Sequence, residues 1–373
     1  MEELVMGLFG GAYRGKTVLV TGHTGFKGSW LSLWLTMMGA RVVGYALAPP
    51  TVPNHYDLLN LDMISIEGDI RDGQKLCDVL AMHKPEIVFH LAAQPLVRHS
   101  YNNPVETYQT NVIGTLNVYE ACRSSDSVRA IVSVTTDKVY ENKEWHWGYR
   151  ENDELGGYDP YSSSKACAEI LTASYRNSFF PLTEYGTSHQ TLLATARAGN
   201  VIGGGDWGKD RLIPDIMKAT AKGEPVVIRN PHSVRPWQHV LESLSGYLLL
   251  GQKLLNGDAP VADSWNFGPM TQDSAAVHSV VKDIHKFWRA TNFTITAGAT
   301  EKLHEARMLR LDTSKANSQL QWLPVWDYDE TISKTVEWYR DYYEGGIIKT
   351  EHDINAYLNS AAERERCWIA PIK

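Results

Sequence analysis

A tyrosine and a lysine, Tyr161 and Lys165, stand four positions apart in the chain. On a helix this spacing puts both side chains on one face. A free tyrosine has a pKa of about 10 and is a poor base at neutral pH. A nearby ammonium group favours the tyrosinate form and lowers that pKa. The pair can then take a proton from a hydroxyl group while hydride leaves the adjacent carbon, which is redox chemistry.

A second reactive group follows residues 130–134, a β-branched run that predicts a strand. Thr136, Asp137 and Lys138 come next, and strand ends carry function in open α/β sheets. Thr136 can hydrogen-bond the reacting hydroxyl, while Asp137 and Lys138 form an acid–base couple. Redox chemistry needs no such couple, but removing water from a keto sugar needs both a base and an acid. The alternative is a solvated turn.

Glycines at a spacing of three follow the first predicted strand, residues 16–21, and open a helix. The whole turn is Gly22, His23, Thr24, Gly25, Phe26, Lys27 and Gly28. Such a turn lets backbone N–H groups approach a pyrophosphate at a helix N-terminus. We therefore predict a dinucleotide site here, with Tyr161 and Lys165 at its nicotinamide end. The alternative is a structural turn, and the Lys27 side chain could equally face solvent.

Two further strand ends suit a dinucleotide. Asp69 and Ile70 follow the third predicted strand, where an aspartate can bind the adenine amino group. Leu91, Ala92 and Ala93 follow the fourth strand, and their small side chains let the chain run close beneath the ligand. Each observation also has a plainer explanation, because an aspartate can cap a helix and alanines can pack tightly.

The choice between NAD and NADP rests on the second predicted strand, residues 41–45. Many NAD sites place a carboxylate at the end of this strand, on the ribose hydroxyls. Here no carboxylate follows, and no arginine follows to hold a 2′-phosphate. We predict NAD as the cofactor.

The first half of the chain alternates strand and helix patterns, which predicts an α/β fold with a Rossmann-type, doubly wound parallel sheet. The glycine- and proline-rich stretch after residue 196 predicts a smaller substrate-binding lobe over the carboxyl ends of the strands. The expected division is a nucleotide-binding domain at 13–196, to which 236–262 returns, a lobe formed by 197–235 and 263–345, and a C-terminal helical tail at 346–373.

Composition narrows the class of protein. The formal net charge is −7 and no long basic run occurs, so nucleic acid and an anionic membrane are not expected as partners. Four scattered cysteines, none in a Cys-x-x-Cys pair, indicate neither a metal site nor a disulfide framework. Residues 1–13 lack a signal-peptide pattern and no apolar run reaches spanning length. A cytoplasmic protein is expected.

Taken together, these residues resemble the extended short-chain dehydrogenase/reductase family, and within it the nucleotide-sugar 4,6-dehydratases. The resemblance covers residues 13 to about 343 and rests on four stretches, namely 21–28, 92–98, 136–140 and 197–207. Relatives that act on dTDP-glucose carry Asp-Glu where this chain has Asp137 and Lys138. The lysine is typical of the branch that acts on CDP-glucose.

The resemblance implies a hydro-lyase that turns CDP-glucose into CDP-4-keto-6-deoxyglucose and leaves NAD as it began. It assigns Tyr161 to the hydroxyl on the fourth carbon, Lys138 to the proton on the fifth, and Asp137 to the hydroxyl leaving the sixth. Such enzymes serve deoxysugar and surface polysaccharide (O-antigen) biosynthesis. A homodimer built from residues 104–123 and 161–176, and possibly a tetramer, is also implied.

The resemblance further suggests substrate contacts. These are Asn200 at the diphosphate, Arg235 at a phosphate, Gln94 and Arg98 at the hexose, and Arg211 and His304 with less definite places. Guanidinium groups suit phosphate recognition because their fork matches two oxygens. For Arg98 and Arg211 the alternative is a surface charge or a structural ion pair.

Three other functions fit parts of the pattern. A nucleotide-sugar 4-epimerase has the same fold, glycine turn and Tyr–Lys pair, but needs no acid–base couple at Asp137 and Lys138. A simple alcohol dehydrogenase would consume NAD stoichiometrically. A non-catalytic NAD-sensing protein would need neither Tyr161 nor Lys165.

Overall fold

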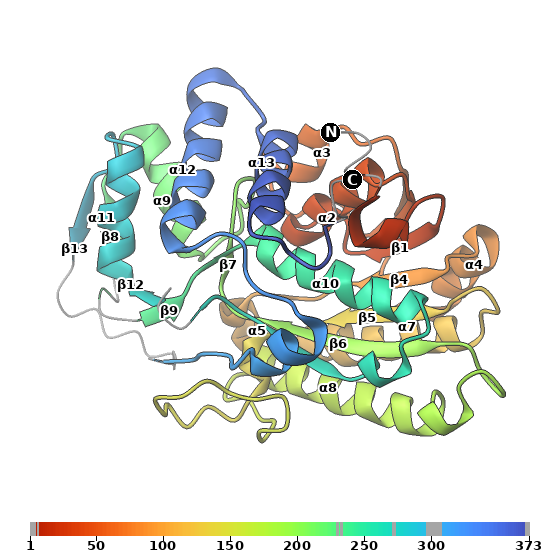
Figure 1. Cartoon of the computed structure of the whole chain (residues 1–373). Helices are drawn as coiled ribbons and strands as arrows, with labels where there is room; N and C mark the ends of the chain where they lie inside the picture. Colours follow the sequence, from red (N-terminus) through yellow and green to blue (C-terminus); the bar gives the residue numbers. More distant parts are fainter. Residues whose placement is uncertain are drawn as a thin grey trace.

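The computed structural model shows a large sheet between helical layers, with a smaller lobe at one end (Figure 1). The structure describes residues 5, 7–228, 231, 234–270, 274–295 and 308–369. Across these ranges, none of the helices combines the length and apolar character needed to cross a membrane.

Seven parallel strands form the large sheet in the order β11-β6-β5-β4-β1-β2-β3. The strands are β1 Thr17–Thr21, β2 Arg41–Ala46, β3 Ile64–Glu67, β4 Ile87–His90, β5 Ala130–Val134, β6 Leu192–Ala198 and β11 Ser264–Phe267. The order reverses between β1 and β4, and ligands of such sheets bind outside the carboxyl ends of the strands at that point. The predicted Rossmann-type fold class is confirmed.

The central strands of the sheet are buried on both faces, whereas the edge strand β3 is largely exposed. Alternate side chains of one buried strand enter different cores. On β1, Val18 and Val20 pack in the cluster that contains Trp30 and Leu248, whereas Leu19 packs in the cluster that contains Val118. Helices α2 (Phe26–Met37) and α10 (Val240–Leu255) supply the first cluster, and α4 (Gly73–His83) and α7 (Gly114–Arg123) supply the second. Burial on both sides explains why these strands read as continuous apolar runs.

The remaining helices of this domain are α3 His55–Leu59, α5 Val97–Asn102, α6 Pro104–Tyr108 and α8 Pro160–Ser178. A π-helical segment, η2 (Gln109–Ile113), joins α6 to α7, so the long helix predicted over 104–123 is continuous but changes its winding in the middle. Short 3-10 segments are η1 Leu8–Gly11, η3 Asp137–Val139, η4 Leu182–Glu184 and η5 Ala259–Val261.

The smaller lobe is built from short strands and three helices, and it lies at the left of Figure 1. Its elements are α9 Leu212–Lys222, β8 Val226–Ile228, β9 Val234–Pro236, β12 Ser274–Ala276, α11 Val277–Phe287, β13 Phe293–Ile295 and α12 Tyr328–Gly345. β12 pairs with β9 in antiparallel orientation, and β13 pairs with β8 in parallel. A two-stranded ladder of β7 (Val201–Ile202) and β10 (Gln238–His239) stands between lobe and sheet.

The predicted start of the second lobe segment at residue 263 is wrong. β11 is the edge strand of the large sheet, with Ser264 opposite Thr195 and Phe267 opposite Ala198. The four residues of β11, Ser-Trp-Asn-Phe, show no strand pattern in the sequence. They form a strand because they pair with β6. Further along, η7 spans Ala316–Leu320 and α13 spans Thr350–Glu363. α13 contacts α2, so the C-terminal segment packs on the nucleotide-binding domain.

Candidate active site

The turn between β1 and α2 can be made only with glycine at two positions. Gly22 has a φ of +76°, and a Cβ there would lie 2.8 Å from the backbone nitrogen of Ala92. A Cβ on Gly28 would lie 2.1 Å from the carbonyl oxygen of Gly22. The missing side chains therefore leave the bare backbone of the turn against the end of β4, at the N-terminus of α2, where a pyrophosphate is bound in this architecture.

His23 lies buried within this turn rather than exposed to solvent. Its Nε2 is 2.7 Å from Ser65 Oγ, and a Cβ on Gly44 would lie 2.3 Å from its ring. Burial lowers the pKa of His23 to about 4, so the imidazole is neutral. The ring fills space beneath β2, a contact the sequence did not suggest. Beside it, Thr24 Oγ1 donates to the Leu47 carbonyl at 2.9 Å.

Asp69 and Ile70 lie at the end of β3, as predicted. The Asp69 carboxylate accepts hydrogen bonds from the Arg71 side chain, which lower its pKa, and from the Arg71 backbone nitrogen at 2.9 Å. Ile70 is buried, and a Cβ on Gly114 would lie 2.6 Å from it. Contact between Asp69 and an adenine remains a prediction, since the carboxylate already holds a neighbouring cation.

Tyr161 lies in the first turn of α8. Asp159 caps that helix by accepting a hydrogen bond from Ser162 N at 3.0 Å, and Pro160 occupies its first position. Burial raises the pKa of Tyr161 to about 12, while a hydrogen bond with Thr136 acts in the opposite direction. The phenol is therefore protonated at rest and needs further positive charge nearby to act as a base.

Lys165 lies one turn further along α8 and is also buried. Its Nζ donates to the carbonyl oxygen of Val134, at the end of β5, at 3.2 Å. Burial and, to a smaller extent, the charge of Lys27 lower the pKa of this ammonium group to about 8. Lys165 thus lies at the carboxyl end of β5.

The acid–base couple occupies η3, directly after β5. Thr136 begins η3, donates to Asp137 Oδ1 at 2.9 Å and accepts from the Lys138 backbone nitrogen at 3.3 Å. Burial raises the pKa of Asp137, and the charges of Lys138, Arg235 and Lys27 oppose the shift. A carboxyl group with a raised pKa suits the role of an acid.

These groups lie close enough for their charges to change one another's pKa. The charge of Asp137 raises the pKa of Tyr161, and the charge of Arg211 lowers it. The charge of Lys27 lowers the pKa of both Asp137 and Lys165. Lys27 Nζ donates to the hydroxyl of Tyr247 on α10 at 3.1 Å, so its side chain points inward from the glycine turn. Of the two orientations open at the sequence level, the structure shows the inner one. Nothing in the sequence pointed to Tyr247.

The predicted substrate residues are placed less uniformly. Both polar atoms of the Gln94 amide bond its own loop, where Oε1 accepts from Leu96 N at 2.6 Å and Nε2 donates to the Leu96 carbonyl at 3.2 Å, and Nε2 also donates to Thr107 Oγ1 on α6 at 2.9 Å. The amide thus shapes the loop after β4, and contact with a hexose stays a prediction. Arg98 Nη1 lies 3.3 Å from Asp210.

The remaining predicted contacts come from β7, α9 and β9. Asn200 accepts a backbone hydrogen bond from Gln238 at 3.3 Å. Arg211 Nη1 donates to Asp206 at 2.8 Å, and the charge of Arg211 also lowers the pKa of Tyr161. The charge of Arg235 likewise lowers the pKa of Asp137. His304 lies outside the described residues.

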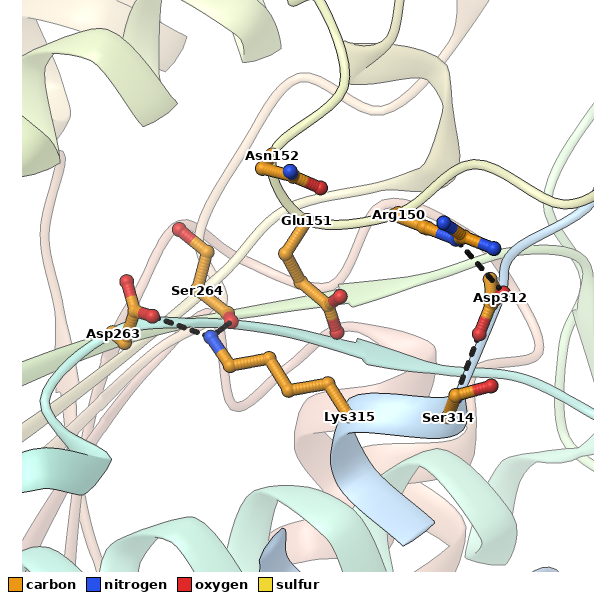
Figure 2. A pocket seen from close by; sticks show the side chains of 8 residues that line it. All are labelled: Arg150, Glu151, Asn152, Asp263, Ser264, Asp312, Ser314 and Lys315. Carbon is orange, nitrogen blue, oxygen red and sulfur yellow. Dashed lines mark hydrogen bonds and ion pairs between the residues drawn. The ribbon is translucent and has the colours of Figure 1, made fainter. Parts of the chain in front are cut away.

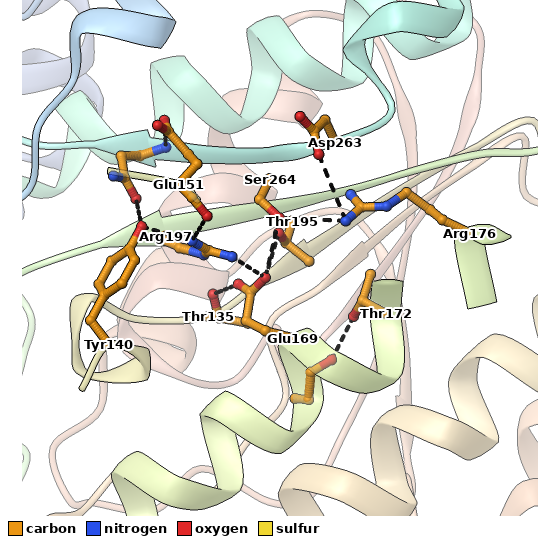
Figure 3. A network of polar contacts seen from close by, with 12 residues as sticks. Thr135, Tyr140, Glu151, Glu169, Thr172, Arg176, Thr195, Arg197, Asp263 and Ser264 are labelled. Carbon is orange, nitrogen blue, oxygen red and sulfur yellow. Dashed lines mark hydrogen bonds and ion pairs between the residues drawn. The ribbon is translucent and has the colours of Figure 1, made fainter. Parts of the chain in front are cut away.

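Sequence reasoning missed a buried ion pair behind these groups. Glu169 on α8 and Arg197 on β6 lie 2.8 Å apart (Figure 3). A polar cavity of about 590 Å³ opens on the far side of that pair, lined by Arg150, Glu151, Asn152, Asp263, Ser264, Asp312, Ser314 and Lys315 (Figure 2). This cavity contains none of the predicted catalytic residues.

The sheet, the glycine turn and the Tyr–Lys pair define a short-chain dehydrogenase/reductase with a Rossmann-type domain. A family model described as GDP-mannose 4,6 dehydratase matches residues 19–335. The chain belongs to this family.

One curated relative and two solved structures resemble this chain over most of its length. A protein of Salmonella typhimurium called CDP-glucose 4,6-dehydratase is 51% identical over 352 residues, which cover 93% of this chain and 98% of that protein. Among solved structures, an epimerase of Methanothermobacter thermautotrophicus is 23% identical with a TM-score of 0.78, covering 91% of this chain and 96% of its own. A dTDP-glucose 4,6-dehydratase of Bacillus anthracis in complex with NAD is 22% identical with a TM-score of 0.73, covering 88% and 98%.

Proposed function

We propose that this chain converts CDP-glucose to CDP-4-keto-6-deoxyglucose and water. The observation that carries the proposal is the position of the acid–base couple, Asp137 and Lys138, in the segment directly after β5, the strand whose last carbonyl is bound by Lys165. The name of the Salmonella relative supports the choice of substrate. A place in deoxysugar and surface polysaccharide (O-antigen) biosynthesis in the cytoplasm follows from the same reasoning.

The residues present fit NAD. Side chains at Gly22 and Gly28 would collide with the backbone of Ala92 and of Gly22, so the turn forms only with bare backbone, which a pyrophosphate at the N-terminus of α2 can approach. Lys165 would hold the nicotinamide ribose, and Asp69 the adenine. When bound, NAD would supply a reversible hydride acceptor that links oxidation at the fourth carbon of the sugar to reduction at the sixth. The dTDP-glucose 4,6-dehydratase of Bacillus anthracis was solved in complex with NAD, which supports the same cofactor here.

The side chains of this chain then divide the proton transfers between them. Tyr161 takes the proton of the hydroxyl on the fourth carbon of the sugar. Thr136 forms a hydrogen bond with the Tyr161 phenol and orients the sugar hydroxyl beside it. The ketone so formed acidifies the proton on the fifth carbon, which Lys138 removes. Asp137 protonates the hydroxyl that leaves the sixth carbon, a role that burial favours because it raises the pKa of this carboxyl group.

Cationic side chains at the lobe side of the pocket suit the diphosphate. The charge of Arg235 lowers the pKa of Asp137, and the charge of Arg211 lowers the pKa of Tyr161, so both guanidinium groups lie near the catalytic residues. A guanidinium group binds phosphate oxygens in a fork geometry. Asn200 precedes β7 at the same edge. We assign these three residues to the diphosphate, and Arg98 to the hexose side, where it would exchange Asp210 for substrate.

The proposed enzyme is a homodimer, and dimers pairing into a tetramer are compatible with it. Apolar side chains stand exposed along the helices that the family resemblance assigned to the interface. On α6 and η2 these are Val105 (69% exposed) and Ile113 (47%), on α8 it is Ile170 (58%), and directly after α8 it is Phe179 (43%). α6 and η2 both contact α8, so the four side chains belong to adjoining elements. Exposed apolar groups gathered in this way mark protein contacts.

Incubation of the purified protein with CDP-, dTDP- and GDP-glucose tests the function. We expect a ketosugar, detected by its absorbance in alkali, from CDP-glucose and little from the other two. Formation of a CDP-hexose epimer without ketosugar would favour the 4-epimerase function instead. Binding of NAD without turnover of any sugar nucleotide would favour a sensor.

A further inference from the structure

The buried carboxylate of Glu169 joins α8 to the two strands beneath it (Figure 3). Its Oε1 accepts a hydrogen bond from Thr135 Oγ1 at 2.5 Å. Its Oε2 accepts from Thr195 Oγ1 at 2.9 Å and from Arg197 Nη2 at 2.8 Å. The side chains of Glu169 and Arg197 are only 1% and 3% exposed. The Glu169 carboxylate on α8 is therefore held by hydrogen bonds from the residue that follows β5 and from two residues of β6.

The guanidinium group of Arg197 extends the same network to the far end of η3. Its Nη1 donates to the Tyr140 hydroxyl at 2.7 Å and to the Glu151 carbonyl at 3.0 Å. The group also lies over the Tyr140 ring, 5.0 Å from its centre. Tyr140 in turn donates to Asn266 Oδ1 at 2.8 Å. Arg197 thus holds the residue at which η3 ends.

These contacts bracket the acid–base couple. Thr135 stands immediately before Thr136, and Tyr140 follows Val139, the last residue of η3. One ion pair therefore fixes both ends of the segment 135–140, which carries Asp137 and Lys138. The same Glu169 lies one helical turn beyond Lys165, on the face of α8 that also carries Tyr161.

We infer that Glu169 and Arg197 are positioning residues that hold the redox pair on α8 and the acid–base couple on η3 in one fixed arrangement. The inference rests on the proposed function. Oxidation and elimination act on neighbouring carbons of one sugar, and a displacement of about 1 Å can cost about a hundredfold in rate. Fold stability alone is a poor explanation, because apolar residues of equal size often stabilise a core as well as a buried ion pair.

Electrostatics adds a second link between Glu169 and the redox pair. Burial lowers the pKa of Lys165 to about 8, and the negative charge of Glu169 opposes this shift. Loss of that charge would let Lys165 lose its proton at lower pH. The tyrosinate form of Tyr161 would then lose the support of a neighbouring ammonium group.

The test compares variants at the two ends of the segment. Glu169→Gln removes the charge, Thr135→Val removes one bond at the start, and Tyr140→Phe removes one bond at the end. The last two leave the ion pair itself intact and so keep the fold. After mixing each variant with CDP-glucose, we expect kcat to fall about 10- to 100-fold with KM within about twofold, in line with a small misalignment. We also expect reduced nicotinamide to accumulate on the protein, because oxidation outruns elimination.

Lys315→Met is the matched control. Lys315 forms an ion pair with Asp263 and lines the polar cavity on the far side of β11 (Figure 2). Loss of this pair should leave kcat, the pH profile and reduced nicotinamide at wild-type levels. For Glu169→Gln we further expect the alkaline limb of the pH profile to move to lower pH.

Two results would overturn the inference. One is wild-type ketosugar formation in all three variants, without accumulated reduced nicotinamide. The other is an equal loss of both half-reactions that follows the loss of thermal stability, which would make the pair merely structural. Absence of ketosugar from the wild-type protein would instead contradict the proposed function, so the two failures are separable.

Discussion

Two buried carboxylates lie near the carboxyl end of β5, and their surroundings shift their pKa values in opposite directions. At Asp137, burial dominates and raises the pKa, although Lys138 opposes it. At Glu169, burial acts in the same direction, but the ion pair with Arg197 and its hydrogen bonds outweigh burial and lower the pKa. The comparison teaches that burial alone does not decide whether an acidic side chain serves as a proton donor or as a fixed anion. The number and charge of its hydrogen-bond donors decide it.

The largest expected effect is at the base beside Asp137. Lys138→Met should leave formation of reduced nicotinamide intact and cut ketosugar formation about 10²- to 10⁴-fold, the range of general acid–base catalysis. Single-turnover absorbance and product analysis measure the two steps separately. Normal ketosugar formation by the variant would contradict the role of Lys138.

Asp137→Asn tests the acid of the couple, as Lys138→Met tests the base. The amide keeps the shape of the side chain but cannot give up a proton, so elimination should slow by about 10²-fold or more. Oxidation should change little. The same readouts apply, and a variant in which both steps fell equally would show that Asp137 acts on Tyr161 rather than on the leaving hydroxyl.

A pH titration of the wild-type enzyme sharpens the contrast. Asp137 has to be protonated and Lys138 unprotonated for elimination, so rising pH removes the acid while it frees the base. The ratio of the wild-type elimination rate to that of Asp137→Asn, in which only the base titrates, should therefore fall about tenfold per pH unit above the pKa of Asp137. Because that pKa is raised, the decline of the ratio should begin above the pH range of an ordinary carboxyl group. A ratio that stays constant or rises with pH across this range would argue against Asp137 as the acid.

The smallest effect extends the comparison to a buried imidazole. His90 lies 2.8 Å from Thr21 and 3.0 Å from Thr115, and burial lowers its pKa to about 3. The unfolded chain takes up a proton below pH ~6.5, so the contribution of neutral His90 is complete above that pH. It is lost as the pH falls toward 3, by about 1.4 kcal/mol per unit.

Melting curves at successive pH values between 7 and 5 measure this loss. His90→Gln keeps two polar atoms but does not titrate, so its melting temperature should fall less steeply toward acid pH than that of the wild type. Equal slopes for both proteins would mean that His90 is not neutral in the folded state.

The sequence was informative wherever local rules fix a position. Tyr161 and Lys165 share a helix face by their spacing, and the glycine turn follows from the steric limits on Gly22 and Gly28. The partners of buried charges were not predictable. Glu169 and Arg197 lie on different elements, 28 positions apart, and only the pairing of β5 with β6 brings Thr135 and Thr195 to the same carboxylate.

The lobe illustrates the same limit. Arg98 and Asp210 lie 112 positions apart in the chain, so their ion pair depends on how α5 meets the loop before α9. β11 was missed for a related reason, since its four residues become a strand only beside β6. Long-range packing, rather than any local pattern, determines both features.

The stacking of Trp368 on Phe9 brings two segments that are distant in the sequence together, and this bears on whether the protein tolerates circular permutation. The two rings lie 5.1 Å apart, and the Phe9 backbone nitrogen donates to the Trp368 carbonyl at 2.8 Å. Segments from opposite ends of the sequence thus touch beside α2. A circular permutant that links them through a short peptide, and opens instead at the exposed turn around Gly186, should fold to the same structure.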